Sequence, residues 1–380
     1  MKVPAGKYSI KNSRKWKSDM RRILITGGAG FIGSNFVRFL LQTEPDVYII
    51  NLDILSYAGS LENLKDLPDQ KRHIFVQGDI CDRDLVDDLL HQHNIDTIVH
   101  FAAETHVDRS IIDPEPFIRT NIIGTQTLLE AAKDYWLDEN KFEIGRVRFH
   151  HISTDEVFGS LAPDDPAFSE STPYAPSSPY AATKAASDHL VRVYGHTYGL
   201  PITITNCSNN YGPYQFPEKL IPLMILNAMN GLHLPIYGDG KQIRDWLYVE
   251  DHCEAIWAVI RRGSPGETYT IGGNNQPTNL LIIETISEIL DECRPESPHA
   301  PHISLVKFVE DRPGHDRRYA MDITKVSREL GWKPHHSLES GLLKTVKWYL
   351  DHPQWIEAIR EQTDYQKWMR LNYEKRETAK

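Results

Sequence analysis

Two short segments carry polar side chains whose types and spacing suit proton transfer. Thr154, Asp155 and Glu156 follow directly on an apolar run, and Tyr180 precedes Lys184 by four positions. Side chains at i and i+4 share one face of a helix, so the phenol and the ammonium should lie together. A phenol has an ordinary pKa of about 10. A nearby positive charge favours the phenolate, which can then accept a proton from a hydroxyl group that Thr154 also hydrogen-bonds. The alternative is an ordinary surface pair on a helix.

A glycine cluster upstream predicts a dinucleotide site. Gly27, Gly30 and Gly33 follow an apolar strand and open a helix, where they permit a tight turn, close approach of a pyrophosphate and close helix packing. Asp53 ends the second strand 20 residues after Gly33, where a carboxylate binds a ribose 2′-hydroxyl and would repel a 2′-phosphate. The cofactor is therefore expected to be NAD rather than NADP. Asp79 follows the third strand and is placed to meet the adenine edge. The alternative for both carboxylates is a turn at a strand end.

The segments between these residues predict an α/β fold with a doubly wound parallel (Rossmann) sheet. Amphipathic helical stretches, including 121–135 and 180–198, alternate with apolar runs of strand length at 22–26, 47–52, 73–77, 97–101, 148–153 and 202–205. Strands separated in this way form parallel sheets with right-handed crossovers. Such sheets bind ligands at the carboxyl ends of their strands, where both Asp53 and Thr154 are placed.

The pattern changes along the chain. Residues 21–206 are expected to form the NAD-binding domain. Residues 207–375 are expected to form mainly a smaller, irregular substrate lobe, because Pro-rich turns interrupt shorter elements there. In this interpretation segments at about 241–273 return to the first domain. Residues 1–20 are polar and basic without periodicity, which predicts a disordered extension or a start upstream of the usual one at Met20.

Composition disfavours several function classes. The net charge of −10 argues against a general nucleic-acid-binding surface. The four cysteines are scattered without metal-ligand spacing, which predicts reduced thiols in a cytoplasmic protein and no metal site. No apolar stretch approaches the roughly 20 residues of a membrane span, and the N-terminus lacks the apolar core of a signal peptide.

Seven motifs resemble, in collinear order, those of the extended short-chain dehydrogenase/reductases. Within that branch the chain is similar to the dehydratases of nucleotide-activated sugars, from Met20 to about Glu374. The departures are the N-terminal extension and Thr105, where relatives often carry Ser. The motifs are Gly27 to Gly33, His100 to Ser110, Ser153 to Glu156, Tyr180 to Lys184, Cys207 to Pro213, Arg244 to Trp246 and Asp311 to His315.

The resemblance implies a reaction and the residues that perform it. Asp155 is expected to be the acid toward the C6 oxygen of a hexose, and Glu156 the base at C5. Two carboxyl groups in one closed site raise each other's pKa, which helps to keep one protonated. The alternative is a pair of solvated turn residues. The catalytic set is therefore Thr154, Asp155, Glu156, Tyr180 and Lys184.

The remaining site residues follow from the same resemblance. The cofactor is expected against Gly27, Gly30, Phe31, Ile32, Gly33, Asp53, Asp79, Ile80, Ala102, Ala103, Thr120, Tyr180 and Lys184. The substrate is expected against Thr105, Thr154, Asn209, Lys219, Arg244, Asn279, Arg312, His315 and Tyr373. Of these, Arg244 and Arg312 are the best pyrophosphate ligands, because a guanidinium presents a planar fork of donors. The alternative for either is a surface salt bridge.

The expected reaction is conversion of dTDP-glucose to dTDP-4-keto-6-deoxyglucose and water with NAD regenerated, by a homodimer joined through helices near 115–135 and 180–198. Thymine and uracil differ by one methyl group, so the base stays open at this level. Two other classes also stay open. A nucleotide-sugar epimerase or decarboxylase is disfavoured by Asp155 and Glu156, and a non-catalytic NAD-binding module is disfavoured by the Tyr180–Lys184 pair.

Overall fold

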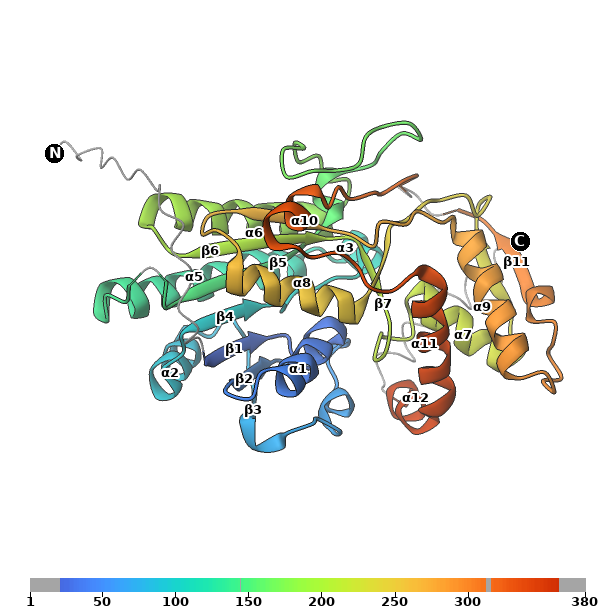
Figure 1. Cartoon of the computed structure of the whole chain (residues 1–380), viewed down its shortest axis with the longest axis horizontal. Helices are drawn as coiled ribbons and strands as arrows, with labels where there is room; N and C mark the ends of the chain where they lie inside the picture. The colour runs from blue at the N-terminus through green and yellow to red at the C-terminus, as the bar shows by residue number, and fades with distance from the viewer. Residues whose placement is uncertain (1–20, 144, 312–315, 362–380) are drawn as a thin grey trace.

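A seven-stranded parallel sheet forms the centre of the molecule (Figure 1), seen in a computed structural model that describes residues 21–143, 145–311 and 316–361. The strand order is β10-β6-β5-β4-β1-β2-β3, so the order reverses between β1 and β4. The strands are β1 (Arg22–Thr26), β2 (Tyr48–Asp53), β3 (His73–Gln77), β4 (Thr97–His100), β5 (Arg148–Thr154), β6 (Ile202–Cys207) and β10 (Thr268–Ile271). The predicted doubly wound sheet is confirmed, and the bounds of the predicted strands are correct to within two residues at either end.

Helices cover both faces of the sheet. The helices α2 (Arg83–His93), α5 (Thr125–Lys133) and α6 (Pro179–Val193) share one apolar cluster with the sheet, whereas α1 (Phe31–Thr43) and α8 (Val249–Arg262) share another. Because both faces are covered, β4 and β5 are buried along their whole length. The expected helices at 121–135 and 180–198 are present, with π-helical turns at Ile118–Gly124, Asp134–Glu139 and Tyr194–Tyr198.

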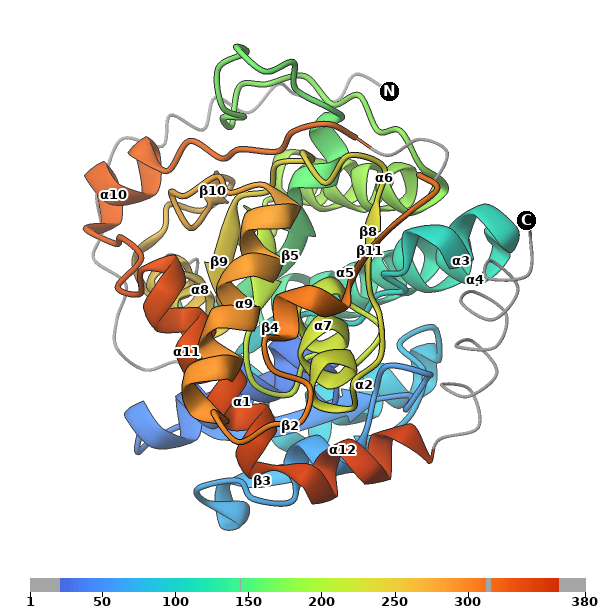
Figure 2. The same ribbon diagram turned by 90° about the vertical axis from the view of Figure 1, so that its right-hand side faces the viewer.

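A second lobe with its own apolar core lies beyond the carboxyl ends of the strands (Figures 1 and 2). Its helices are α7 (Leu220–Met229), α9 (Asn279–Cys293), α11 (Leu338–Asp351) and α12 (Pro353–Arg360). Two short parallel pairs complete it: β8 (Leu234–Tyr237) with β11 (Val306–Val309), and β7 (Asn209–Tyr211) with β9 (Trp246–Tyr248). The lobe is more regular than its turn-rich sequence suggests, because the Pro-rich segments connect amphipathic helices instead of replacing them.

The remaining short elements lie at the surface or between the lobes. The helices are α3 (Val107–Ile112), α4 (Glu115–Phe117) and α10 (Thr324–Leu330), and 3-10 turns occur at Leu61–Leu64, Gln70–Arg72, Asp155–Phe158 and His302–Leu305. The edge strand β10 belongs to the central sheet and the preceding helix α8 packs against this sheet, although both follow β7 in the chain. The division at residue 206 stays a prediction, and residues 1–20 lie outside the described ranges. Across those ranges, none of the helices combines the length and the apolarity that crossing a membrane requires.

Candidate active site

A cavity of about 540 Å³ lies between the carboxyl edge of the sheet and the second lobe. All the site residues predicted from the sequence that fall in the described ranges line this cavity, from Gly27 near β1 to Asn279 at the start of α9. Arg312, His315 and Tyr373 were also predicted to bind the substrate, but they lie outside the described residues. The structure therefore brings both predicted sets into one space, while the role of each residue stays a prediction.

The glycine turn forms a close-packed cradle at one end of the cavity. Gly27 has a φ of 73°, and a Cβ atom there would lie 2.6 Å from the backbone nitrogen of Ala102. A Cβ atom on Gly33 would lie 2.3 Å from the carbonyl oxygen of Gly27. No side chain fits at either position, so the first turn of α1 lies directly against the turn. The first N–H groups of a helix lack acceptors within it and bind anions.

The two predicted adenosine carboxylates lie next to this cradle. Asp53 accepts hydrogen bonds from the N–H groups of Ala29 (2.9 Å) and Leu55 (2.8 Å), so its carboxylate is held against the glycine turn. Burial raises the pKa of Asp53 despite these two bonds. Asp79 accepts from the N–H of Cys81 (2.8 Å) and from Arg119 (3.1 Å). Burial of Asp79 tends to raise its pKa. The two hydrogen-bond donors have the larger combined effect, so the pKa of Asp79 is lowered. The glycine cradle and the two carboxylates together fit a dinucleotide whose ribose hydroxyls would contact Asp53.

The three predicted catalytic residues at the end of β5 form a compact hydrogen-bonded group. The Thr154 hydroxyl donates to Oδ1 of Asp155 at 3.1 Å and accepts from the N–H of Glu156 at 3.2 Å. The same hydroxyl interacts with the phenol of Tyr180 as a donor, because it lowers the pKa of that group. Since a hydroxyl carries one proton, Thr154 can donate to either neighbour but not to both at once. Thr154 thus lies between the phenol and the carboxyl group.

The environment of Asp155 suits a general acid. Burial and the adjacent charge of Glu156 raise the pKa of Asp155 to about 8, although the Thr154 hydroxyl and the charge of Arg244 act in the opposite direction. A carboxyl group with this pKa is mainly protonated at neutral pH and can give its proton to a leaving group. The prediction that paired carboxyl groups keep one proton therefore has a physical basis in the structure.

Tyr180 and Lys184 differ from the simple expectation of an ammonium that lowers the pKa of a phenol. Burial, followed by the charge of Glu156, raises the pKa of Tyr180 well above its ordinary value. The ammonium of Lys184 donates to the carbonyl oxygen of Ile152 at 2.8 Å, and burial lowers its pKa to about 8. The two side chains share one face of α6 as predicted. Burial, however, has a larger effect on the pKa of Tyr180 than the nearby positive charge of Lys184.

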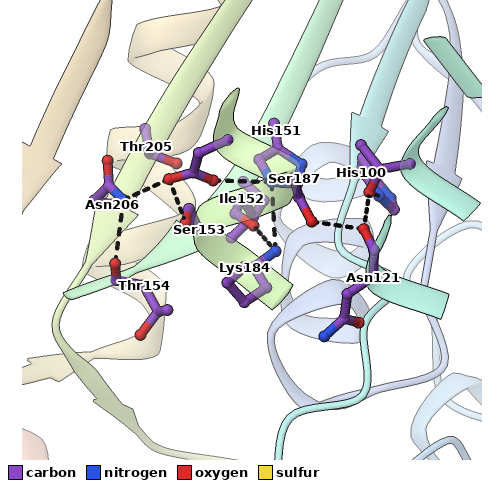
Figure 3. A network of polar contacts seen from close by, with 12 residues as sticks. His100, Asn121, His151, Ile152, Ser153, Thr154, Lys184, Ser187, Thr205 and Asn206 are labelled. Atoms are coloured by element: carbon purple, nitrogen blue, oxygen red, sulfur yellow. Dashed lines mark hydrogen bonds and ion pairs between the residues drawn. The ribbon is translucent and has the colours of Figure 1, made fainter. Parts of the chain in front are cut away.

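Figure 3 shows polar residues around Lys184 that the sequence analysis missed. His151 lies 3.4 Å from the Lys184 ammonium, and Asn206 donates to the carbonyl oxygen of Thr154 at 3.1 Å. Both also contact Asp188, whose pKa is lowered to about 2 against the effect of burial. One sequence signal could have found Asp188, because it follows Tyr180 and Lys184 at the same spacing of four. Within the described ranges, no group of three or more His, Cys, Asp or Glu side chains is arranged to hold a metal ion.

A doubly wound sheet with a dinucleotide cradle, a hydroxyl at the end of β5 and a Tyr/Lys pair on the following helix defines an extended short-chain dehydrogenase/reductase. The family model described as GDP-mannose 4,6 dehydratase matches residues 24–345. The chain belongs to this family, and the resemblance inferred from the seven motifs is confirmed.

Similar proteins cover most of the chain. A dTDP-glucose 4,6-dehydratase of Shigella flexneri is 54% identical over 364 residues, which are 94% of this chain and all of that protein. The enzyme of the same name from Neisseria meningitidis serogroup B is 56% identical over 342 residues, or 90% of this chain and 96% of that one. A crystal structure of DesIV, a dTDP-glucose 4,6-dehydratase from Streptomyces venezuelae solved with NAD bound, has a TM-score of 0.80 and is 47% identical. That match covers 89% of this chain and 99% of DesIV.

Proposed function

We propose that this chain catalyses the NAD-dependent dehydration of dTDP-glucose to dTDP-4-keto-6-deoxyglucose. The observation that carries the proposal is the pair of adjacent carboxyl groups, Asp155 and Glu156, in the same cavity as Thr154, Tyr180 and Lys184. An epimerase removes and returns one hydride at C4 and needs no further acid or base. Loss of water from C5 and C6 needs both, and only a catalyst would need the two carboxyl groups beside the Tyr/Lys pair.

The first step is oxidation at C4. Tyr180 accepts the proton of the C4 hydroxyl group, which Thr154 also hydrogen-bonds, while the cradle of Gly27 to Gly33 and Asp53 orients the cofactor. NAD, when bound, supplies a positive charge that favours the phenolate of Tyr180, takes the hydride from C4 and later returns it to C6.

The second step is elimination across C5 and C6. The C4 ketone acidifies the C5–H bond, so Glu156 removes this proton as a carboxylate. Asp155, protonated because of its raised pKa, gives its proton to the C6 hydroxyl, which leaves as water. In the third step Glu156 returns a proton to C5 as the hydride arrives at C6.

The protons balance within the site. One turnover leaves Tyr180 with the proton of the C4 hydroxyl and Asp155 without the proton that left in the water. Glu156 ends as it began. Moving one proton from Tyr180 to Asp155 restores the starting state, and the Thr154 hydroxyl lies between the two groups and already donates to Asp155. Thr154 therefore has a second role, which is to reset the acid and the base.

The nucleotide part of the substrate is proposed to lie in the second lobe. The wall of the cavity there is apolar where Leu223, Met224 and Pro235 meet. Four predicted ligands supply the polar groups around it, namely Asn209, Lys219, Arg244 and Asn279. The guanidinium of Arg244 is fixed by the carbonyl oxygens of Ile243 (2.8 Å) and Asp316 (2.9 Å) and by the face of the Tyr319 ring. A fixed guanidinium suits a pyrophosphate better than a mobile one.

The assembly is proposed to be a cytoplasmic homodimer. Large apolar side chains are exposed on α3, the π-helical turn at 118–124, the end of α6 and the π-helical turn that follows it, and α6 packs against both α3 and the turn at 118–124. All but those on α3 fall in the predicted interface near 115–135 and 180–198. These exposed side chains include Ile112, which is 73% exposed, and also Ile111, Ile118, Ile123, Val193 and Tyr198. Light scattering of the purified protein checks this, and a monomer mass would contradict it.

A product assay tests the proposed function. The purified chain is incubated with dTDP-glucose, or with UDP-glucose as the matched control, and the sugar product is identified by NMR. The expected result is a 4-keto-6-deoxy sugar, formed faster from dTDP-glucose. A C4 epimer, a pentose or no turnover with either substrate would contradict the proposal.

A further inference from the structure

We propose that Asp188 is a positioning residue for the oxidation step: its buried carboxylate keeps Lys184 charged and fixes the strand end that carries Thr154. The inference rests on the proposed function, because the step concerned is the proton transfer to Tyr180. Asp188 lies on α6 four residues after Lys184, on the face that points toward β5 and β6.

The carboxylate of Asp188 receives hydrogen bonds from three elements. Its Oδ2 accepts from the Tyr174 hydroxyl at 2.6 Å, from the Ser153 hydroxyl at 2.9 Å and from the Asn206 amide at 3.1 Å. Its Oδ1 lies 3.2 Å from Nε2 of His151. The side chain has no exposed surface. A buried carboxylate with this many donors is held rigidly and stays ionised.

One set of these contacts extends to Thr154. Asn206 uses its amide to donate both to Asp188 and to the carbonyl oxygen of Thr154, the latter at 3.1 Å. Ser153 is the residue that immediately precedes Thr154 on β5. The position of the Thr154 hydroxyl, and therefore of its hydrogen bonds to Tyr180 and Asp155, depends on a strand end that Asp188 holds from two sides.

The other set extends to Lys184. The Lys184 ammonium lies 3.4 Å from Nε2 of His151 (Figure 3), and the same nitrogen lies 3.2 Å from Oδ1 of Asp188, so one imidazole nitrogen contacts both charged groups. Because a carboxylate accepts, the tautomer with the proton on Nε2 suits Asp188, and the ammonium then interacts with Asp188 through its charge. A fully buried ammonium loses its hydration and needs a counter-charge to remain protonated.

Asp188 is the counter-charge that the described surroundings offer. Burial lowers the pKa of His100 on β4 and that of His151 on β5, the latter to about 4. Burial raises the pKa of Cys207 on β6 to about 12 and also raises that of Tyr180. These groups are uncharged near neutral pH. Around Asp188 itself the charged groups are Lys184 and, next to the Tyr174 hydroxyl, Arg192.

Removal of the negative charge of Asp188 should shift the pH dependence of the oxidation step in one direction. The Asp188→Asn variant loses the negative charge that raises the pKa of Lys184, so that pKa falls below its wild-type value of about 8. The ammonium is then lost at lower pH, and the alkaline limit of the oxidation step moves to lower pH by about one unit or more. The measurement is the rate of reduced nicotinamide formation in a single turnover with dTDP-glucose, followed by absorbance across neutral and alkaline pH.

Matched variants distinguish the effect of the Asp188 charge on Lys184 from a purely structural role of the Asp188 side chain. Ser153→Ala removes one hydrogen bond to the same carboxylate but keeps its charge, so its alkaline limit should stay where it is in the wild type. Asp188→Ser also removes the charge and should reproduce the shift of Asp188→Asn. If neither variant folds, Asn206→Ala carries the test, because it keeps the charge of Asp188 but removes its link to the carbonyl oxygen of Thr154. The oxidation rate should then fall while the alkaline limit stays at its wild-type position.

The outcomes are distinct. A downward shift in the neutral Asp188 variants but not in Ser153→Ala supports the inference. An equal fall in rate at all pH values in an active, folded Asp188 variant overturns it, as does an unchanged oxidation rate in Asn206→Ala. If the wild type forms neither reduced nicotinamide nor product with dTDP-glucose, the proposed function itself fails.

Discussion

The Thr154 hydroxyl donates a hydrogen bond to Asp155 at 3.1 Å and also interacts with the phenol of Tyr180, whose pKa it lowers. The residue proposed to accept a proton in the oxidation is therefore joined, through one hydroxyl, to the residue proposed to give a proton in the elimination. An epimerase would have no use for this link, because only the elimination consumes the proton on Asp155.

Thr154→Val keeps the shape of the side chain and removes this link. Because a proton can then no longer pass from Tyr180 to Asp155 through a hydroxyl group, the steady-state rate should fall by about 10²-fold or more. The first turnover should be slowed less than the later ones. Thr154→Ser restores a hydroxyl and should recover most of the rate. Rapid mixing followed by steady-state measurement checks this, and equal loss in the first and later turnovers would argue against the reset.

Asp53→Ala should weaken NAD binding and relax the selection against NADP. The Asp53 carboxylate is held at the glycine turn by Ala29 and Leu55, where we expect it to bind a ribose hydroxyl and to repel a 2′-phosphate. Isothermal titration calorimetry of the purified variant with NAD and with NADP gives the affinity for each dinucleotide. The prediction fails if the wild type binds or uses NADP as well as NAD.

Arg244→Ala should raise KM because a fixed pyrophosphate ligand is lost. The structure adds a second effect, since the positive charge of Arg244 lowers the pKa of Asp155. Asp155 acts while protonated, so product formation in the wild type should fall as pH rises through about 8. In Arg244→Ala this pKa rises, and the alkaline limit of elimination should move to higher pH. A pH profile of kcat for both proteins measures it, and an unmoved limit with unchanged KM would exclude both roles.

Substitutions at the Tyr/Lys pair and at the carboxyl pair should stop the reaction at different steps. Tyr180→Phe removes the base for oxidation, so reduced nicotinamide should not form. Asp155→Asn and Glu156→Gln should still permit oxidation, and reduced nicotinamide should accumulate because elimination is slowed by about 10² to 10⁴. Exchange of the C5 hydrogen with deuterated solvent should slow most in Glu156→Gln. Near-normal product formation by both carboxyl variants would show that they are ordinary turn residues.

Local patterns in the sequence predicted the strands of the central sheet except the edge strand β10, and they predicted the glycine turn, Asp53 and the Tyr180–Lys184 pair that line the cavity. The spacing of Tyr180 and Lys184 places them on one helix face, and the distance from Gly33 to Asp53 brings a carboxylate to the glycine turn. Both relations depend on geometry within one element or one βαβ unit, which short-range patterns encode.

Contacts and charge effects between residues far apart in the sequence could not be predicted from such local patterns. The pKa of Tyr180 is raised because the fold buries it beside Glu156, which follows a different element, β5. The effect of Arg244 on Asp155 joins residues 89 positions apart. Asp188 lies between these cases, since its spacing from Lys184 was visible but its contacts with Ser153 and Asn206 come from neighbouring strands.

The fate of the hydrogen at C4 tests the central claim most directly. Wild-type protein is incubated with dTDP-glucose deuterated at C4, mixed with an equal amount of unlabelled substrate, and the product is analysed by mass spectrometry and NMR. Because Glu156 and Asp155 open C6 to the returning hydride, the deuterium should appear at C6 of the same molecule that carried it, with a ketone at C4. Deuterium that returns to C4 of a sugar with its C6 hydroxyl intact would contradict the dehydratase and identify the chain as an epimerase.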